Sequence, residues 1–220
     1  NTEGANNVAV GVNSLFANTT ASNNTALGYA ALTANTTGTQ NVAVGALAGD
    51  ACTTGNNLTA IGYAAGSAVT TGSENTLVGR DAGSAIQGGG SNTFIGHRSG
   101  DATTSASNNT GVGMHSLGAN TTGANNTALG KDALVSNTTA SNNIAIGMSA
   151  LYANTTAASN VAIGAYAGDA ISTSPSNTLV GTSAGGAITT GNGENVCVGN
   201  NAGTLMTTGQ QNVFVGDNNG

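Results

Sequence analysis

The sequence predicts an all-β fold, a parallel β-solenoid of about thirteen coils of 17 residues each. The first observation is a five-residue phrase that returns along the whole chain, as in Asn143-Ile144-Ala145-Ile146-Gly147. The second is its constant spacing, because the thirteen glycines follow one another at equal steps, and only the step from Gly181 to Gly199 is longer by one. The third is the alternation of side chains before each glycine, which is typical of a β-strand.

The strand prediction rests on positions 2 to 4 of the repeat, counted from its asparagine. In Asn41-Val42-Ala43-Val44-Gly45, Val42 and Val44 point to one side and Ala43 to the other. Threonine or a branched aliphatic residue at position 2 suits a pleated surface. A helix is disfavoured by this density of Gly, Asn and Thr. One repeat unit alone cannot bury its own apolar face, so the coils must stack.

Stacking turns each repeat position into a column that rises about 4.8 Å per coil. Position 4 is always aliphatic, and we expect this column to form the core rib. The predicted core rib is Val10, Leu27, Val44, Ile61, Val78, Ile95, Val112, Leu129, Ile146, Ile163, Val180, Val198 and Val215.

Position 1 predicts an asparagine ladder, in which side-chain amides form hydrogen bonds from coil to coil. It is asparagine in every coil except the fourth, where Leu58 stands. The predicted ladder is Asn7, Asn24, Asn41, Asn75, Asn92, Asn109, Asn126, Asn143, Asn160, Asn177, Asn195 and Asn212.

Position 3 faces away from the predicted core rib and is nevertheless apolar. It is alanine in most coils and larger in some. One interpretation is a second buried surface between parallel chains, with Leu77, Phe94, Leu179 and Phe214 as the candidate interface. The alternative is a thin monomeric solenoid with scattered apolar surface residues, which are common on soluble proteins.

The coils are of two kinds, which predicts a conserved core volume. Where position 9 is leucine, as at Leu15, position 12 is asparagine, as at Asn18. Where position 9 is glycine, position 12 is aliphatic, methionine, cysteine or threonine, so both positions are expected to face the same interior. We predict a single repeat domain, 1–220, with coils that start at Asn7 and recur with the period of the repeat. The coil that starts at Asn41 matches the one that starts at Asn160, which indicates a seven-coil super-repeat with its boundary near residue 125.

Composition narrows the function. Only 5% of residues are charged and the net charge is −6, so a basic surface for nucleic-acid phosphates is missing and we expect no nucleic-acid partner. No apolar run reaches the roughly 18 to 20 residues that span a membrane, so we expect no membrane span.

Cys52 and Cys197 lie nine coils apart, roughly 40 Å, and are expected to be buried free thiols.

The sequence offers no convincing catalytic or metal-binding constellation, and we expect no enzyme activity, no catalytic residue, no metal site and no cofactor. His97 and His115 occupy neighbouring coils, but a zinc site needs further ligands and Asp101 is a distant candidate. Solvated loop histidines are the better interpretation.

Threonine pairs at positions 13 and 14 raise an alternative function. Nine coils carry them, from Thr19-Thr20 to Thr207-Thr208, and stacked threonines are the surface that ice-binding solenoids use. Adjacent threonines on a strand point to opposite faces, and the array is interrupted at Gln87-Gly88. Threonine at turns and strand ends is the simpler explanation.

The repeated phrase Asn-x-Ala-Ile/Val-Gly-x-x-Ala/Ser resembles the repeat of trimeric autotransporter adhesin heads. The fuller unit, Asn126 to Thr139, resembles the shaft repeats of phage tail fibres and related bacterial fibre proteins. The resemblance covers all thirteen coils, although the period is longer than the usual adhesin-head unit. It implies a left-handed β-roll or β-helix, commonly trimeric, that holds a binding tip away from a surface.

These observations lead to the expectation of a non-enzymatic extracellular structural fibre or filament, the shaft of an adhesin or tail fibre at a cell surface or on a virion, that acts in surface attachment. Its expected partner is itself, as a lateral trimer or, since neither end carries a capping repeat, an end-to-end filament. A cell-surface receptor or glycan is a further candidate partner. The alternative is a ligand-binding solenoid such as an ice-binding protein.

Overall fold

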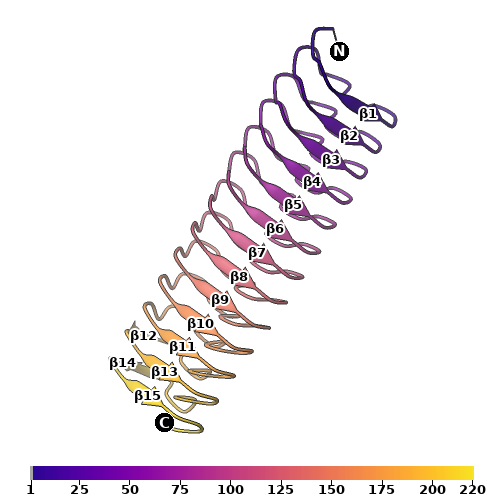
Figure 1. Ribbon diagram of the computed structural model, residues 1–220. Coiled ribbons are helices and arrows are strands. Elements are labelled where there is room, and N and C mark those ends of the chain that lie inside the picture. The colour runs from indigo at the N-terminus through magenta and orange to yellow at the C-terminus, as the bar shows by residue number, and fades with distance from the viewer. Residues whose placement is uncertain (1) are drawn as a thin grey trace. The chain divides into compact units, whose positions relative to one another are not determined.

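The computed structural model describes residues 2–220, which form strands and turns and no helix. The chain divides into two compact units, Asn1–Asn109 and Thr110–Gly220. Each unit is a parallel β-solenoid in which one short strand per coil stacks on the next in chain order (Figure 1). The all-β solenoid prediction is therefore confirmed, whereas the left-handed winding and the super-repeat boundary stay predictions.

The strands sit at repeat positions 2 to 4, where the sequence places them. The first unit contains β1 (Val8–Val10), β2 (Thr25–Leu27), β3 (Val42–Val44), β4 (Thr59–Ile61), β5 (Thr76–Val78) and β6 (Thr93–Ile95). The second contains β7 (Thr110–Val112), β8 (Thr127–Leu129), β9 (Ile144–Ile146), β10 (Val161–Ile163), β11 (Thr178–Val180), β12 (Thr190–Gly193), β13 (Val196–Val198), β14 (Thr208–Gln210) and β15 (Val213–Val215).

Neighbouring strands within a unit pair in a constant register of one repeat. Ala43 of β3 is opposite Ala60 of β4, and Leu179 of β11 is opposite Cys197 of β13 across the one longer step. The extra residue of that step lies near a second, smaller pairing, β12 with β14, whose register shifts between Thr190 and Gly193. The insertion is thus absorbed in the turn region, and the main sheet continues in register.

The interior lies on the opposite side of the strand from the predicted one. In β9, Ala145 is fully buried, whereas Ile144 is 39% exposed and Ile146 is half-buried. Position 4 is half-buried or exposed in every coil, so the predicted core rib was wrong for all of its members: Val10, Leu27, Val44, Ile61, Val78, Ile95, Val112, Leu129, Ile146, Ile163, Val180, Val198 and Val215.

The reason is the period of the strand. Residues at positions 1 and 3 share a face, so an asparagine that joins a buried ladder brings position 3 inward and sends positions 2 and 4 outward. The asparagines do point inward, as Asn41 and Asn143 are fully buried. Side-chain size was misleading because the narrow interior is filled mainly by alanine from the strand and by larger residues from the rest of the coil.

The predicted interface was wrong for the same reason. Leu77, Phe94 and Leu179 are fully buried inside their own chain, and Phe214 is half-buried. They fill the solenoid interior and leave no apolar column at position 3 to contact a partner.

The predicted asparagine ladder is present in both units. The backbone N–H of Asn41 donates to Oδ1 of Asn24 at 3.0 Å, and the Asn41 side-chain amide donates across the interior to the Gly55 carbonyl at 2.9 Å. The same bond between coils joins Asn160 to Asn143 at 2.9 Å. The Oδ1 atom of such an asparagine accepts a bond from the next coil and Nδ2 donates to the far wall of its own coil, so most of these buried polar atoms have partners. The Nδ2 atom of Asn160 is an exception and has none.

The predicted compensation between side-chain volumes at positions 9 and 12 is confirmed, and it also involves position 3. A Cβ atom added to Gly83 would lie 2.7 Å from Cδ2 of Leu77 and 2.9 Å from Cδ1 of Ile86. In the other kind of coil, leucine fills this space and Asn137 donates to the Ala140 carbonyl at 3.0 Å. Glycine at position 9 thus makes room for larger residues at positions 3 and 12.

Candidate functional site

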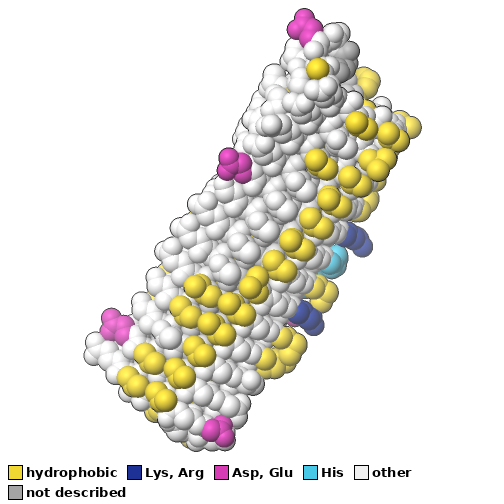
Figure 2. Space-filling model, in the orientation of Figure 1, with side chains coloured by type: hydrophobic (Ala, Val, Ile, Leu, Met, Phe, Trp, Pro, Cys, Tyr) yellow, Lys and Arg dark blue, Asp and Glu magenta, His cyan; other side chains and the backbone are white. Residues whose placement is uncertain are grey.

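Two surfaces of the solenoid carry side chains other than the small polar residues that dominate the chain, and the first is the outer sheet face. We define it as the first and third residues of strands β1 to β11, β13 and β15, which are threonine or aliphatic throughout. Exposed fractions include 46% for Leu27, 38% for Ile163 and 66% for Val215. Hydrophobic side chains form visible rows on the face shown in Figure 2. The third residue of each of these strands is a member of the predicted core rib.

The second surface is the variable ridge, which we define as repeat positions 6, 7 and 10. These positions lie in the turns that follow each strand, and they hold almost all of the chain's chemically distinctive side chains. Every Tyr, His, Lys, Arg and Asp of the sequence falls on them: Tyr29, Asp50, Tyr63, Arg80, Asp81, His97, Arg98, Asp101, His115, Lys131, Asp132, Tyr152, Tyr166, Asp169 and Asp217. Sorting residue types by repeat position would have found this ridge without a structure.

The fold fixes the backbone of the ridge but not its chemistry. Position 7 adopts a positive φ whatever residue stands there, 56° at Asp81, 55° at Arg98 and 58° at Tyr166. Within each unit, successive coils are joined at this point by a backbone bond whatever the side chain, such as Asp81 N–H to the Tyr63 carbonyl at 3.0 Å. The stacking of coils therefore does not depend on which side chains stand on the ridge, and they can serve contacts with other molecules.

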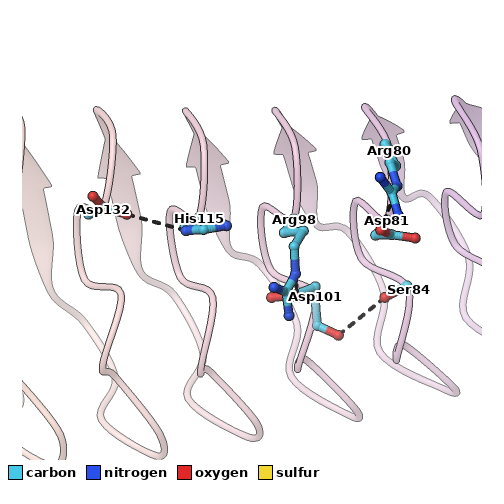
Figure 3. Close-up of polar contacts among 7 residues, drawn as sticks. All are labelled: Arg80, Asp81, Ser84, Arg98, Asp101, His115 and Asp132. Atoms are coloured by element: carbon cyan, nitrogen blue, oxygen red, sulfur yellow. Dashed lines mark hydrogen bonds and ion pairs between the residues drawn. The ribbon is translucent and has the colours of Figure 1, made fainter.

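A charged groove in the first unit is the most distinctive part of the ridge. Arg80 Nε lies 3.2 Å from Oδ2 of Asp81, and Arg98 Nε lies 2.7 Å from Oδ2 of Asp101 (Figure 3). The Ser84 hydroxyl donates to the Asp101 carbonyl at 3.5 Å. The groove has a volume of about 410 Å³, and its lining residues are Arg80, Asp81, Ser84, His97, Arg98 and Asp101.

An aromatic side chain continues the groove along the ridge. The guanidinium carbon of Arg80 lies 5.9 Å from the centre of the Tyr63 ring, within the distance of a cation–π contact. Tyr63 is itself 52% exposed. The ring orients Arg80 while a large part of its own apolar surface stays accessible.

The ion pairs of the charged groove contribute little to stability. The Arg80 and Arg98 side chains are 67% and 53% exposed, and ion pairs in such surroundings contribute about 0 to 1 kcal/mol. Two arginines and two aspartates give these four side chains no net charge. The groove is therefore a closely spaced set of hydrogen-bond donors and acceptors rather than an anion site.

The second unit carries a smaller polar cluster on its part of the ridge. His115 Nδ1 lies 3.5 Å from Oδ1 of Asp132, and Lys131 Nζ lies 3.5 Å from Oδ2 of the same carboxylate (Figure 3). The two histidines thus belong to different units, and Asp101 is already paired with Arg98. Within residues 2–220, no three His, Cys, Asp or Glu side chains are grouped so that they could hold a metal ion.

The remaining titratable side chains are poor nucleophiles or isolated acids. Cys52 and Cys197 are free and buried, as expected, and burial raises the pKa of the Cys52 thiol to about 11. Burial likewise raises the pKa of Cys197, and the pKa values of Asp50 and Asp169 on the ridge. A thiol with so high a pKa is mainly protonated at neutral pH and reacts slowly.

The threonine pairs divide into two roles. Hydroxyls at position 13 donate to the carbonyl of the next coil, as Thr138 does to Thr155 at 3.0 Å and Thr36 to Thr53 at 3.0 Å. Position 14 is exposed in every coil. In most pairs the hydroxyl of one member is thus occupied by a bond that holds the coils together.

The fold and these surfaces define a β-solenoid repeat protein. No helix long and apolar enough to cross a membrane occurs in the described part of the chain. No protein-family model, curated protein or solved structure matches the sequence. The resemblance to adhesin heads and tail-fibre shafts accordingly stays a prediction.

Proposed function

We propose that the chain is a non-enzymatic structural fibre module, an extracellular shaft of the adhesin or tail-fibre type that acts in surface attachment. The observation that carries this proposal is the constant register in which each coil binds the next. Within each unit, strand pairing, turn bonds and the asparagine ladder repeat with the same partners one coil later. Such a body gains length by addition of coils without any change in its cross-section, which is what a shaft requires.

The outer sheet face is where copies of the chain would pack side by side. Each three-residue strand covers roughly 50 Å² of sheet, from about 3.3 Å per residue and about 4.8 Å between strands. The six strands of the first unit and the seven of the second therefore offer roughly 650 Å² in all. A stable interface buries about 800 Å² per partner. We therefore expect self-association that depends on concentration and strengthens when many coils act together.

Sedimentation equilibrium of the purified chain tests this association. We expect multimers at tens of micromolar and dissociation on dilution. The double variant Ile144→Lys and Ile163→Lys should sediment as a monomer with its fold retained, because it places charges on the outer sheet face at positions already exposed. Thr139→Lys with Thr156→Lys, which adds the same charge at exposed position 14, is the control and should associate like the parent. A monomer at all concentrations would refute lateral packing.

Removal of one coil tests the shaft itself. Deletion of one whole repeat, 143–159, should leave a folded protein, because residue 160 then takes over the contacts of residue 143 in the same register. Deletion of 143–160, one residue more than a repeat, leaves one coil a residue short. Unlike the extra residue of the longer step, a missing residue cannot be absorbed by a turn, so this deletion should prevent the second unit from folding. Circular dichroism and electron microscopy would compare the two proteins. Equal folding of both would refute a register-based shaft.

The outer sheet face also favours ice binding as a second candidate function. It presents two columns of threonine and aliphatic residues, as Thr127 and Leu129 do in β8, at the regular spacing of a parallel sheet. This array is more regular than the threonine pairs, half of whose hydroxyls are occupied. Thermal hysteresis at micromolar protein, lost in the Ile144→Lys and Ile163→Lys variant, would place ice binding first. Its absence would exclude this candidate.

A further inference from the structure

We propose that the charged groove of the variable ridge is a binding site for a neutral saccharide displayed on a surface. The proposal deepens the attachment function and rests on it for its biological role, although binding itself can be measured on the isolated chain. It concerns the side of the shaft, at the six residues that line the groove and at the neighbouring Tyr63.

The first argument is the concentration of charge. The sequence contains three Lys or Arg and nine Asp or Glu residues in 220. Four of these twelve, Arg80, Asp81, Arg98 and Asp101, line one groove formed by two successive coils. Since exposed ion pairs contribute little to stability, the fold gives no reason for this concentration.

The second argument is a comparison within the chain. In the last two coils, Asn200, Asn201 and Asn218 occupy the repeat positions that Arg80, Asp81 and Arg98 hold in the charged groove. There Asn200 Nδ2 donates to Oδ1 of Asp217 at 2.9 Å, and strands β13 and β15 pair in the usual register. The same backbone therefore forms without the arginines, so their presence in the groove is a matter of function.

The third argument is the match between the groove and a sugar. A sugar hydroxyl both donates and accepts hydrogen bonds, whereas guanidinium groups only donate and carboxylates only accept. The groove holds two pairs of a donor and an acceptor, 3.2 Å apart in Arg80–Asp81 and 2.7 Å apart in Arg98–Asp101, so a sugar hydroxyl beside either pair can meet both kinds of group. An acidic sugar would gain from the arginines but would be repelled by the aspartates, which favours a neutral one.

Size and the aromatic ring agree with this class of ligand. The volume of about 410 Å³ lies within the roughly 300 to 1,000 Å³ of small-molecule sites. The exposed Tyr63 ring can pack against the C–H face of a sugar while its hydroxyl stays in water. A shallow polar site of this kind binds one sugar weakly, and repeated copies on a multimeric shaft would add avidity.

Titration calorimetry of the purified full chain tests the proposal. The probes are oligosaccharides of neutral glucans, mannans and galactans, with oligogalacturonate and oligosialic acid as the acidic arm. We expect the parent to bind at least one neutral probe more tightly than either acidic one. The variant Arg80→Asn and Arg98→Asn, which copies Asn200 and Asn218, should bind it at least tenfold more weakly.

The control variant is Asn200→Ala with Asn218→Ala, at the same repeat positions in the other unit. It should bind the neutral probe like the parent. No binding to any neutral probe, a preference for the acidic probes, or equal loss in the two variants would overturn the proposal. Sedimentation of the Arg80→Asn and Arg98→Asn variant should match the parent. Failure of the shaft function would instead appear as a monomeric parent, so the two failures are distinguishable.

Discussion

The glycine at position 5 offers the sharpest test of how the coils stack, and Gly79→Ala is the substitution of choice. Gly79 has a φ of 135°, which side-chain-bearing residues rarely adopt. A Cβ atom at this residue would lie 2.5 Å from the carbonyl oxygen of Gly96 and 2.7 Å from its carbonyl carbon. These are backbone atoms of the next coil, so they cannot rotate away as a side chain could.

The expected cost follows from two contributions. A non-glycine residue in such a region of φ costs about 1 to 3 kcal/mol. Relief of the clash requires the two coils to separate locally, which weakens bonds such as Gly79 N–H to the Ile61 carbonyl and Gly96 N–H to the Val78 carbonyl, both 2.8 Å. At about 1 kcal/mol for each bond, the total is about 3 to 5 kcal/mol. For a chain of this length, that lowers the midpoint of thermal unfolding by roughly 10 °C.

Thermal unfolding followed by circular dichroism would measure the effect, with Gly88→Ala as the matched control. Gly88 belongs to the same coil, and the nearest atom to an added Cβ is the Thr71 hydroxyl oxygen at 3.5 Å, an ordinary contact. Both substitutions restrict the unfolded chain equally, so Gly88→Ala should be neutral or stabilising by up to about 1 kcal/mol. Equal midpoints for the two variants would refute the close stacking of position 5.

Three further predictions concern the interior. Ala145→Leu should destabilise the protein by about 1 to 3 kcal/mol through overpacking, whereas Ile146→Asn should change the free energy of unfolding by less than about 1 kcal/mol. Chemical denaturation would measure both. A larger loss for Ile146→Asn than for Ala145→Leu would show that position 4, and not position 3, faces the core. Thr103→Val should stabilise by about 1 kcal/mol in the same assay, because the buried Thr103 hydroxyl has no hydrogen-bond partner; a loss of stability would indicate one. Raising the pH from 9 to about 11 should lower the free energy of unfolding by about 2 to 3 kcal/mol, because the Cys52 thiol ionises at lower pH in the unfolded chain than in the folded one. Cys52→Val should remove this dependence on pH. If the variant keeps the same pH profile as the parent, the thiol is not its cause.

The path of the chain could be predicted from the sequence because the same repeat pattern occurs thirteen times. A constant period fixes the register of every strand, and glycine at position 5 fixes each corner. The pairing of Ala43 with Ala60 or of Ala145 with Ala162 follows from counting alone. The asparagine ladder was predictable for the same reason, because a polar residue that recurs at one position must meet its own copies in a stack.

The direction of the side chains could not be decided by hydrophobicity. Alternation separates Ala145 from Ile146 but does not say which of them faces inward. The information was in Asn143, which shares a face with Ala145, and in Gly83, whose lack of a side chain leaves room for Leu77. In a solenoid this thin, the interior selects residues by volume, so alanine can be core and isoleucine can be surface. The charged groove was missed because charge was counted over the whole chain and not by repeat position.

Some repeat positions are fixed by the stacking of coils and others are free to vary, and this difference has a physical cause. Positions 1, 3 and 5 are constrained because their side chains, or the lack of one, contact the next coil, as Asn41 and Gly79 do. At the variable ridge a backbone bond joins successive coils whichever side chains stand there, as in the bond from Arg98 N–H to the Arg80 carbonyl at 3.0 Å. Substitutions on the ridge therefore change the surface chemistry at little cost in stability. A repeat of this kind can acquire a binding groove such as the one at Arg80 and Asp101, or lose it, while the register of the shaft is preserved.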